Sequence, residues 1–230
     1  PKENSDLKIL NLVEDNLDLI RDISPFWYGL TGETSIKDKY ALGRYTTSKE
    51  AVIARLKANG LLLLPTITDD TKKLVLANLL ANPTSRTNIV QTIKALVLKY
   101  NYDGIDLDFE VFYTQDGRSS WPTTKPNWIA FIKELSTALH EQGKLLSVTT
   151  PPDFAPETKR AGNWVFSWAE IGPHIDRLRI MAYDFSTVNP GPLRPLPRRH
   201  DAASPGGGAR AHPRRAFARA NARAGSSRSE

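Results

Sequence analysis

The sequence predicts an α/β protein with a mainly parallel sheet. Strand-like and helix-like segments alternate from Leu7 to about Leu193, and such alternation is typical of βαβ units. Five strand-like segments precede residue 190, whereas an eight-stranded α/β barrel needs about 250 residues. An open, doubly wound sheet fits this count better, but no glycine-rich phosphate loop follows any of the strands. Both an incomplete barrel and an open sheet are therefore consistent with the pattern.

The first half of the chain contains two helix-like and two strand-like segments. Apolar residues recur at helical spacing over 9–23, and the aromatic segment 24–30 is typical of a strand. Thr47-Ser-Lys-Glu50 has the pattern of a capping box that opens a helix, which Gly60 would end. The continuous apolar run 61–67 predicts a fully buried strand.

The second half of the chain repeats this alternation. A long helix is predicted over 85–99, and the acidic strand 103–110 follows it. The amphipathic segment 125–142 predicts a helix that stops at Gly143. The remaining elements are a strand at 145–150, a short helix at 164–171 and a strand at 178–184.

By composition, the chain divides into residues 1–193 and 194–230. The second part holds nine arginines, no lysine and two acids, and it has no Leu, Ile, Val, Tyr or Trp after Leu196. Such a segment buries too little apolar surface to offset its ordering entropy, so a disordered basic tail is predicted. The same Arg/Ala/Pro/Gly mixture is typical of a shifted reading frame in GC-rich DNA. We prefer the frameshift interpretation, because the change falls inside a pattern that should continue.

The bulk composition excludes several classes of function. The net charge of +6 comes from the tail, so residues 1–193 are nearly neutral and give no support for nucleic-acid binding. The absence of cysteine excludes disulfides and thiolate metal sites, and the four histidines show no metal-ligand spacing, so no metal or cofactor is predicted. No apolar run approaches the length of a membrane span. Residue 1 is Pro rather than Met, which predicts a processed or truncated start with any signal peptide upstream.

Residues 103–110 carry the strongest chemical signal in the chain, because they place four carboxylates within eight residues. Strand side chains alternate between faces, so Asp106, Asp108 and Glu110 are predicted to share one face. Asp103 lies off this parity and is expected to fix the start of the strand. Repulsion and burial both disfavour ionisation, so one acid should keep its proton near neutral pH and act as a general acid. An isolated D-x-D-x-E is also compatible with a divalent-cation site.

Two motifs occur in order along the chain. The acidic strand forms a complete D-G-x-D-x-D-x-E, and Met181-Ala-Tyr183-Asp184 forms M-x-Y-D at the end of a later strand. Together they resemble glycoside hydrolase family 18, the chitinase-like barrels, over about residues 9–193. Ser24-Pro-Phe-Trp-Tyr28 and Pro190-Gly-Pro192 resemble the bacterial spore and cell-wall branch. The resemblance implies a parallel (β/α)8 TIM-type barrel that is incomplete, with about strands 2–6 present and both ends truncated, and it makes the cation-site interpretation less favoured.

The resemblance also implies roles for individual residues. The family cleaves β-1,4-linked N-acetylglucosamine polymers, such as chitin or peptidoglycan, with the substrate's own N-acetyl oxygen as nucleophile and retention of configuration. Glu110 would protonate the glycosidic oxygen, Asp108 would hold the acetamide N–H, and Asp106 would share a proton with Asp108. Tyr183 would hydrogen-bond the acetamide oxygen. Substrate contacts are expected from Asp184, Met181, Trp27 and Tyr28.

Other interpretations remain open at this stage. A noncatalytic sugar-binding relative would typically have lost the proton donor, whereas Glu110 is retained; an inactive, truncated and frameshifted fragment is the third hypothesis. Aromatic residues such as Trp27 and Tyr28 most often fill cores. Trp121 could line a substrate groove, and Arg179 could point into the barrel against a carboxylate. We expect a monomer with a polysaccharide as its partner, located outside the cell or at the cell wall or spore.

Overall fold

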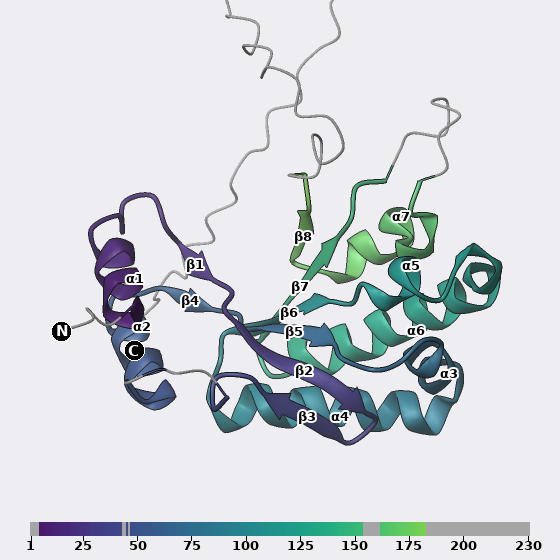
Figure 1. Ribbon diagram of the computed structural model, residues 1–230, viewed down its shortest axis with the longest axis horizontal. Coiled ribbons are helices and arrows are strands. Elements are labelled where there is room, and N and C mark those ends of the chain that lie inside the picture. Colours follow the sequence, from purple (N-terminus) through teal and green to yellow (C-terminus); the bar gives the residue numbers. More distant parts are fainter. Residues whose placement is uncertain (1–4, 43–44, 46, 154–161, 183–230) are drawn as a thin grey trace, which may run out of the picture. The chain divides into compact units, whose positions relative to one another are not determined.

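The computed structural model describes residues 5–42, 45, 47–153 and 162–182. Tyr183, Asp184 and the tail 194–230 lie outside the described residues, so the predictions made for them remain predictions. Figure 1 labels the helices and strands and colours them along the sequence, from purple at α1 to green at β8.

The centre of the fold is a six-stranded sheet. Its strands, in spatial order, are β3 (Ser35–Asp38), β2 (Phe26–Gly32), β5 (Thr66–Asp69), β6 (Gly104–Asp108), β7 (Leu145–Thr150) and β8 (Arg177–Ile180). All neighbours pair in parallel except β3, which is antiparallel to β2. Beginning at β2, each later parallel strand lies beside the one before it, without the reversal of order that defines a doubly wound sheet. The strand order is therefore that of a barrel, but the barrel is not closed within the described residues, where β3 and β8 are the sheet edges.

Helices follow most of the parallel strands. They are α1 (Ser5–Glu14), α2 (Lys49–Ala58), α3 (Val75–Ala81), α4 (Pro83–Lys99), α5 (Val111–Thr114), α6 (Trp121–His140) and α7 (Trp168–Ile171), with 3-10 turns η1 (Arg118–Ser120), η3 (Trp164–Phe166) and η4 (Gly172–His174). A separate two-stranded parallel pair joins β1 (Asp22–Ile23) to β4 (Leu62–Leu63). The long helices α4 and α6 lie side by side along one face of the sheet (Figure 1).

Several predicted elements are confirmed. The strand at 145–150 matches β7, and the predicted helices at 47–59 and 85–99 match α2 and α4. The side chain of Ser48, one residue after the predicted capping position, accepts a hydrogen bond from Ala51 N and caps α2. Gly60 and Gly143 both have positive φ angles, two and three residues after the last residues of α2 and α6, as helix-ending glycines should.

Other predicted boundaries are wrong, for local reasons. Helix 9–23 ends at Glu14, where the side chain of Asn16 donates to the Leu12 carbonyl oxygen at 2.8 Å and caps the helix end. The apolar run 61–67 divides into β4 and β5 around Pro65, which has no N–H for a ladder hydrogen bond. The helix predicted over 125–142 begins earlier, at Trp121, and Ser167, with φ 53°, interrupts the one predicted over 164–171. The hairpin strand β3 and helix α3 were not predicted.

The two faces of the sheet differ sharply in polarity. The outer face, under the helices, carries apolar side chains that are fully buried: Ile67, Ile105, Leu107, Leu146 and Val148. Each contributes about 1.5–3 kcal/mol to the free energy of unfolding through burial of apolar surface. The strand register places on the opposite face, in lateral rows, Thr66, Asp106, Ser147 and Arg177, then Thr68, Asp108, Thr149 and Arg179. The inner face therefore presents polar and charged side chains that can take part in a reaction, whereas the outer face contributes the apolar core that stabilises the fold.

The sheet is strongly curved. Arg179 Nη2 of β8 lies 2.7 Å from Asp22 Oδ1 of β1, although 157 residues separate them. Four strand spacings, about 19 Å in a flat sheet, lie between β2, which directly follows β1, and β8. The ion pair can form only because the sheet curls and brings its first and last parallel strands toward each other.

Close approach of β6 and β7 requires a glycine at the first residue of β6. A Cβ at Gly104 would overlap the backbone oxygen of Leu145, which cannot move without breaking the ladder. We expect Gly104→Ala to reduce the free energy of unfolding by about 1–3 kcal/mol, as measured by urea denaturation. Gly172→Ala is the matched control, because φ is −50° and no neighbouring atom in the described part of the chain lies within 4 Å of the added methyl group. Equal stabilities of the two variants would contradict this account of the β6–β7 contact.

Candidate active site

Asp106 lies at the middle of β6, on the inner face of the sheet, and is only 2% exposed. Its Oδ2 accepts hydrogen bonds from Thr66 Oγ1 and Thr149 Oγ1, both at 3.0 Å. The two threonines come from the neighbouring strands β5 and β7, so the parallel register itself supplies the donors. A buried carboxylate that is hydrogen-bonded from both sides keeps a fixed orientation.

A positive charge stands beside Asp106. Arg179 Nη1 lies 3.8 Å from Asp106 Oδ2, while the other end of the guanidinium holds Asp22. Arg177 also reaches Asp22, at 3.3 Å. Arg179 therefore points toward an inner-face carboxylate, the arrangement that the sequence left open, and it links the innermost acid to the β1–β8 ion pair.

Asp108 is buried almost as fully as Asp106, but the described residues give it fewer hydrogen bonds. It is 5% exposed, and its buried Oδ1 accepts no hydrogen bond from any of the described residues. Burial, followed by the negative charges of Glu110 and Asp106, raises the pKa of Asp108 to about 7, against an opposing effect of Lys39; the ordinary value is about 3.9. Asp108 can therefore exchange a proton near neutral pH. From the sequence, the acid that keeps its proton was expected to be the general acid, a role that the resemblance gives to Glu110, so the raised pKa lies on a neighbouring acid instead.

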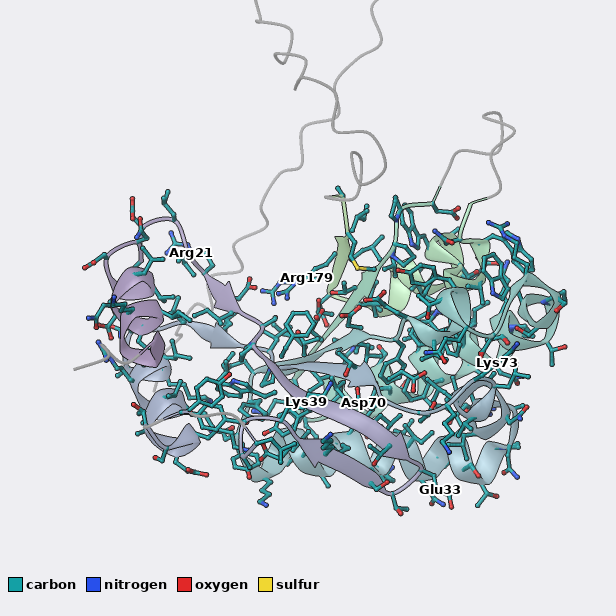
Figure 2. All side chains as sticks on the ribbon, in the orientation of Figure 1. Arg21, Glu33, Lys39, Asp70, Lys73 and Arg179 are labelled. Carbon is teal, nitrogen blue, oxygen red and sulfur yellow. The ribbon has the colours of Figure 1, made fainter. Side chains whose placement is uncertain are left out.

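Lys39 brings a second cation to this part of the sheet. Its ammonium group donates to Thr68 Oγ1 at 2.6 Å and to Asp70 Oδ1 at 2.8 Å. Figure 2 shows Lys39 and Asp70 next to each other over β2 and β5, with Arg179 farther along the sheet on β8. Lys39 directly follows the hairpin strand β3, so the hairpin, which the sequence analysis did not predict, places this positive charge.

Glu110 lies just beyond the strand rather than on it. β6 ends at Asp108, and Glu110 has helical φ and ψ angles (−94° and −14°) as the residue that precedes α5. Strand alternation therefore does not extend from Asp108 to Glu110, and the predicted single row of three strand acids is corrected to two strand acids and one acid at a helix start. The half-buried Glu110 stays close enough to raise the pKa of Asp108, and its Oε2 accepts a hydrogen bond from the Tyr113 hydroxyl at 2.7 Å.

A cavity of about 260 Å³ opens on the inner face. Residues from all five parallel strands, or directly beside them, line it: Ser24, Phe26, Thr66, Asp106, Asp108, Thr149, Arg179, Ile180 and Met181. Met181, a predicted substrate-binding residue, is 6% exposed and belongs to this lining. Phe26 is 63% exposed, and the sequence did not indicate that it would border the acids.

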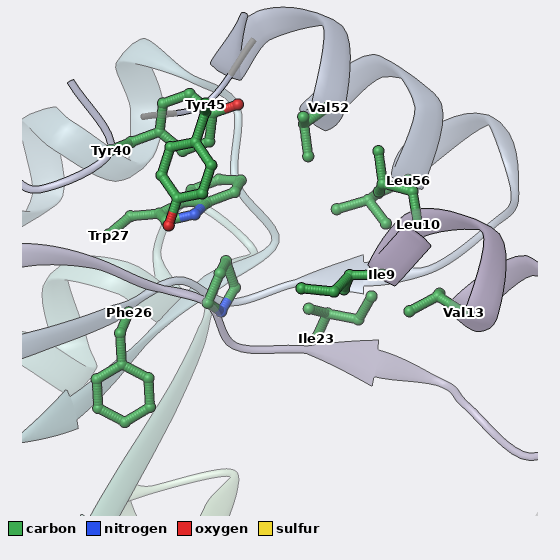
Figure 3. Close-up of a pocket in the computed structure, with 11 residues that line it drawn as sticks. Ile9, Leu10, Val13, Ile23, Phe26, Trp27, Tyr40, Tyr45, Val52 and Leu56 are labelled. Atoms are coloured by element: carbon green, nitrogen blue, oxygen red, sulfur yellow. The ribbon is translucent and has the colours of Figure 1, made fainter. Parts of the chain in front are cut away.

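Trp27 and Tyr28, predicted to contact the sugar, lie elsewhere. Trp27 borders a different, apolar cavity between α1, α2 and β1, where Figure 3 shows it beside Tyr40 and Tyr45. The Tyr28 hydroxyl is 2.7 Å from that of Tyr102 and accepts from Lys49 at 3.1 Å. Both are core residues, and neither lines the cavity that contains Asp106 and Asp108.

Two further sequence predictions are settled by contacts. Asp103 Oδ2 accepts the Leu63 backbone N–H at 2.9 Å, so it fixes the start of β6 against β4 as expected. Trp121 is 2% exposed and donates through Nε1 to the Phe112 carbonyl oxygen at 2.8 Å. Trp121 is therefore a core residue at the start of α6, and the predicted role in lining a groove is wrong.

The described residues define the chemistry open to this site. No cluster of three or more potential metal-ligating side chains occurs among them, and the oxygens of Asp106 are taken up by hydroxyl groups and Arg179. None of the helices that the structure describes has the length and apolar character of a membrane span. A buried acid that titrates near pH 7, next to a second and a third carboxylate, is an arrangement suited to proton transfer.

Comparisons with known proteins agree with this geometry. The family model described as glycosyl hydrolases family 18 matches residues 22–218, past the predicted start of the tail. The Drosophila melanogaster protein named Probable chitinase 10 is 31% identical over 125 residues, which is 52% of this chain and 5% of that protein. YdhD of Bacillus subtilis (strain 168), whose name links it to sporulation and to glycosylase activity, is 29% identical over 128 residues, or 53% of this chain and 27% of YdhD.

The fold is also that of solved chitinase structures. A chitinase from Chromobacterium violaceum superposes with a TM-score of 0.61 at 17% identity, covering 78% of this chain and 53% of that one. The chain thus spans about half the length of that structure, and smaller fractions of the relatives named above. The family match extends over most of the sequence and includes the acidic strand, the curved sheet and the cavity. The chain therefore belongs to the glycosyl hydrolases of family 18.

Proposed function

We propose that this chain carries the three catalytic acids, Asp106, Asp108 and Glu110, of a glycoside hydrolase that cleaves β-1,4-linked N-acetylglucosamine polymers, either chitin or peptidoglycan. The observation that supports it best is Asp108, a buried acid with a pKa of about 7 that lines a cavity together with Asp106 and lies close enough to Glu110 for that charge to raise its pKa. Such an acid costs stability at neutral pH, and a cost of this kind is typical of a functional site.

The proposed mechanism assigns one step to each acid. Glu110 gives its proton to the glycosidic oxygen while the bond from that oxygen to the sugar C1 breaks. The substrate's N-acetyl oxygen attacks C1 in place of an enzyme carboxylate and forms a cyclic oxazolinium ion. Asp108 holds the acetamide N–H and stabilises that cation, and Asp106 shares a proton with Asp108. Water then attacks C1 with Glu110 as the base, so the configuration is retained.

The contacts around Asp106 and Asp108 favour this division of roles. Asp106 is fixed by two threonine hydroxyls and lies beside Arg179, so it is the immobile member. Asp108 Oδ1 has no hydrogen-bond partner among the residues that the structure describes, so this oxygen can accept a hydrogen bond from a substrate N–H. Tyr183 and Asp184, predicted to contact the acetamide and the sugar, lie outside the described residues and are part of the proposal on sequence grounds.

Retention of Glu110 favours an enzyme over a noncatalytic sugar-binding relative. The open sheet edges at β3 and β8 favour the competing possibility that this chain alone is inactive. The substrate class and the relationship to YdhD support action outside the cell, at a cell wall or at a spore.

The decisive experiment measures hydrolysis of labelled N-acetylglucosamine oligomers and of purified peptidoglycan by the full chain, with products separated by mass. The wild-type chain should release N-acetylglucosamine-terminated products from at least one substrate, and Glu110→Gln should release none above the blank. The anomeric configuration of the first product, followed by proton NMR, should be that of the substrate. A folded wild-type chain that cleaves neither glycan, or a Glu110→Gln variant that cleaves as fast as wild type, would refute the proposal.

A further inference from the structure

A single helical turn follows Glu110, and one of its side chains donates a hydrogen bond back to the Glu110 carboxyl group. α5 begins directly after Glu110, and Tyr113 lies three residues later, on the same side of this turn. The Tyr113 hydroxyl is 2.7 Å from Glu110 Oε2, the length of a strong O–H···O hydrogen bond to a carboxylate. The Glu110 backbone oxygen also accepts from Tyr113 N and from Thr114 Oγ1 and N, at 2.9 to 3.1 Å.

Packing holds the Tyr113 ring in addition to the hydrogen bond. The two residues before it in α5, Val111 and Phe112, are buried. The Tyr113 ring meets the buried Phe166 edge-on, with centroids 6.0 Å apart. The phenol oxygen is therefore held in place even when Glu110 changes its charge, as a preorganised donor must be.

We propose that Tyr113 is a positioning residue for Glu110, and that it decides which carboxyl oxygen carries the catalytic proton. An oxygen that accepts the phenol hydrogen is the unprotonated one, so the proton resides on Oε1. When the Oε1–H bond breaks, the proton moves to the glycosidic oxygen and the electron pair stays on the carboxylate. Tyr113 then donates to the newly formed anion and stabilises it. This inference rests on the proposed function, since it assumes that Glu110 is the acid.

A purely structural tyrosine would give different results. In that case the ring fills space beside Phe166, and its hydroxyl only finds the nearest acceptor. Tyr113→Phe keeps the ring and removes the hydroxyl, so it separates the two roles. Tyr102→Phe is the matched control, because it removes a hydroxyl from another 2.7 Å contact, with Tyr28, in the core away from the cavity.

The first measurement does not depend on turnover. The full chain is labelled with ¹³C at glutamate side-chain carboxyls, the Glu110 signal is assigned with Glu110→Gln, and each variant is titrated by NMR. Because a donor favours the ionised form of a carboxyl group, the midpoint for Glu110 should move to higher pH in Tyr113→Phe. It should not move in Tyr102→Phe. An unchanged midpoint in Tyr113→Phe would overturn the inference.

The second measurement uses the hydrolysis assay. Tyr113→Phe should lower kcat roughly tenfold with little change in KM, and the alkaline side of its pH profile should move to higher pH. Tyr102→Phe should keep the wild-type profile. If the wild-type chain cleaves no glycan, the proposed function fails while the NMR titration still decides whether Tyr113 controls Glu110. If the wild type is active and Tyr113→Phe has the wild-type kcat and profile, only the inference about Tyr113 fails.

Discussion

Asp108→Asn is expected to reduce kcat by at least about 100-fold and, above pH 7, to raise the midpoint of thermal unfolding by a few degrees. Under the proposed mechanism, activity falls because an amide cannot exchange the proton or stabilise the cation. Stability rises because the wild-type carboxyl must ionise while 5% exposed and between the negative charges of Asp106 and Glu110. Asn has nearly the same volume and carries no charge.

The sign of the pH dependence follows from the raised pKa of Asp108. A carboxyl whose pKa is about 7 in the folded state and about 3.9 when unfolded holds more protons in the folded state. Its contribution to stability is complete below pH 4 and is lost as the pH rises through 7. At pH 5 the side chain is protonated in the folded wild-type protein, so the advantage of Asn should be much smaller there than at pH 8. Burial also raises the pKa of Asp69, to about 6, but Asp69 is present in both proteins and cancels in the comparison.

Thermal unfolding at pH 5 and pH 8, followed by circular dichroism, checks this prediction together with kcat. Asp18→Asn is the control for loss of one negative charge, because Asp18 is exposed in the turn after α1. It should change neither quantity at either pH. A stabilisation by Asp108→Asn that is equal at both pH values would show that the carboxyl does not titrate in this range, and it would remove the main support for the proposed function.

Regular strand patterns predicted the sheet well because burial determines them. The alternation in β6 placed Asp106 and Asp108 on one face and Leu107 on the other, as the register shows. The β7 boundaries followed from a short apolar run that Pro151 ends. In both strands one face packs against helices and must be apolar. The alternation of polar and apolar residues therefore predicts which face each side chain occupies.

The predictions that proved wrong concern residues where the backbone departs from regular strand geometry. The pairing of β2 with β5 shifts register between Phe26 and Tyr28, and an irregularity of this kind breaks the alternation of faces. Phe26 therefore reaches the cavity while Trp27 and Tyr28 join the core. Glu110 is displaced for a related reason, because the chain turns into α5 immediately after Phe109. No local residue pattern distinguishes one more strand residue from the first residue of a helix.

Trp128→Ala is expected to have the largest effect on stability, a loss of about 3–5 kcal/mol. Trp128 is fully buried in α6, donates through Nε1 to the Phe166 carbonyl oxygen at 3.1 Å, and meets Phe109 with ring centroids 6.2 Å apart. Phe109 lies between Asp108 and Glu110 in the chain, so the same ring that stabilises the core supports both acids from behind.

Trp128→Phe separates the two consequences, because it retains an aromatic ring and loses the indole N–H. The buried Phe166 carbonyl loses its donor, which should cost about 1–3 kcal/mol and leave the protein folded at 25 °C. If Phe109 moves into the space that the smaller ring leaves, Asp108 and Glu110 shift relative to each other. A displacement of about 1 Å at reacting groups can reduce the rate about 100-fold. We therefore expect kcat of Trp128→Phe to fall roughly tenfold or more in the folded variant, with urea denaturation and the hydrolysis assay run on the same samples.

Trp164→Phe is the matched control. Trp164 is 39% exposed and meets Trp121 edge-on, away from Phe109. Its replacement should leave kcat unchanged and alter the free energy of unfolding by about 0.5 kcal/mol or less. If Trp128→Phe loses stability but keeps full activity, the acids are positioned by β6 and α5 alone. A parallel loss of stability and rate in Trp128→Phe, absent from Trp164→Phe, would mean that the aromatic core behind the sheet sets the distance between Glu110 and Asp108.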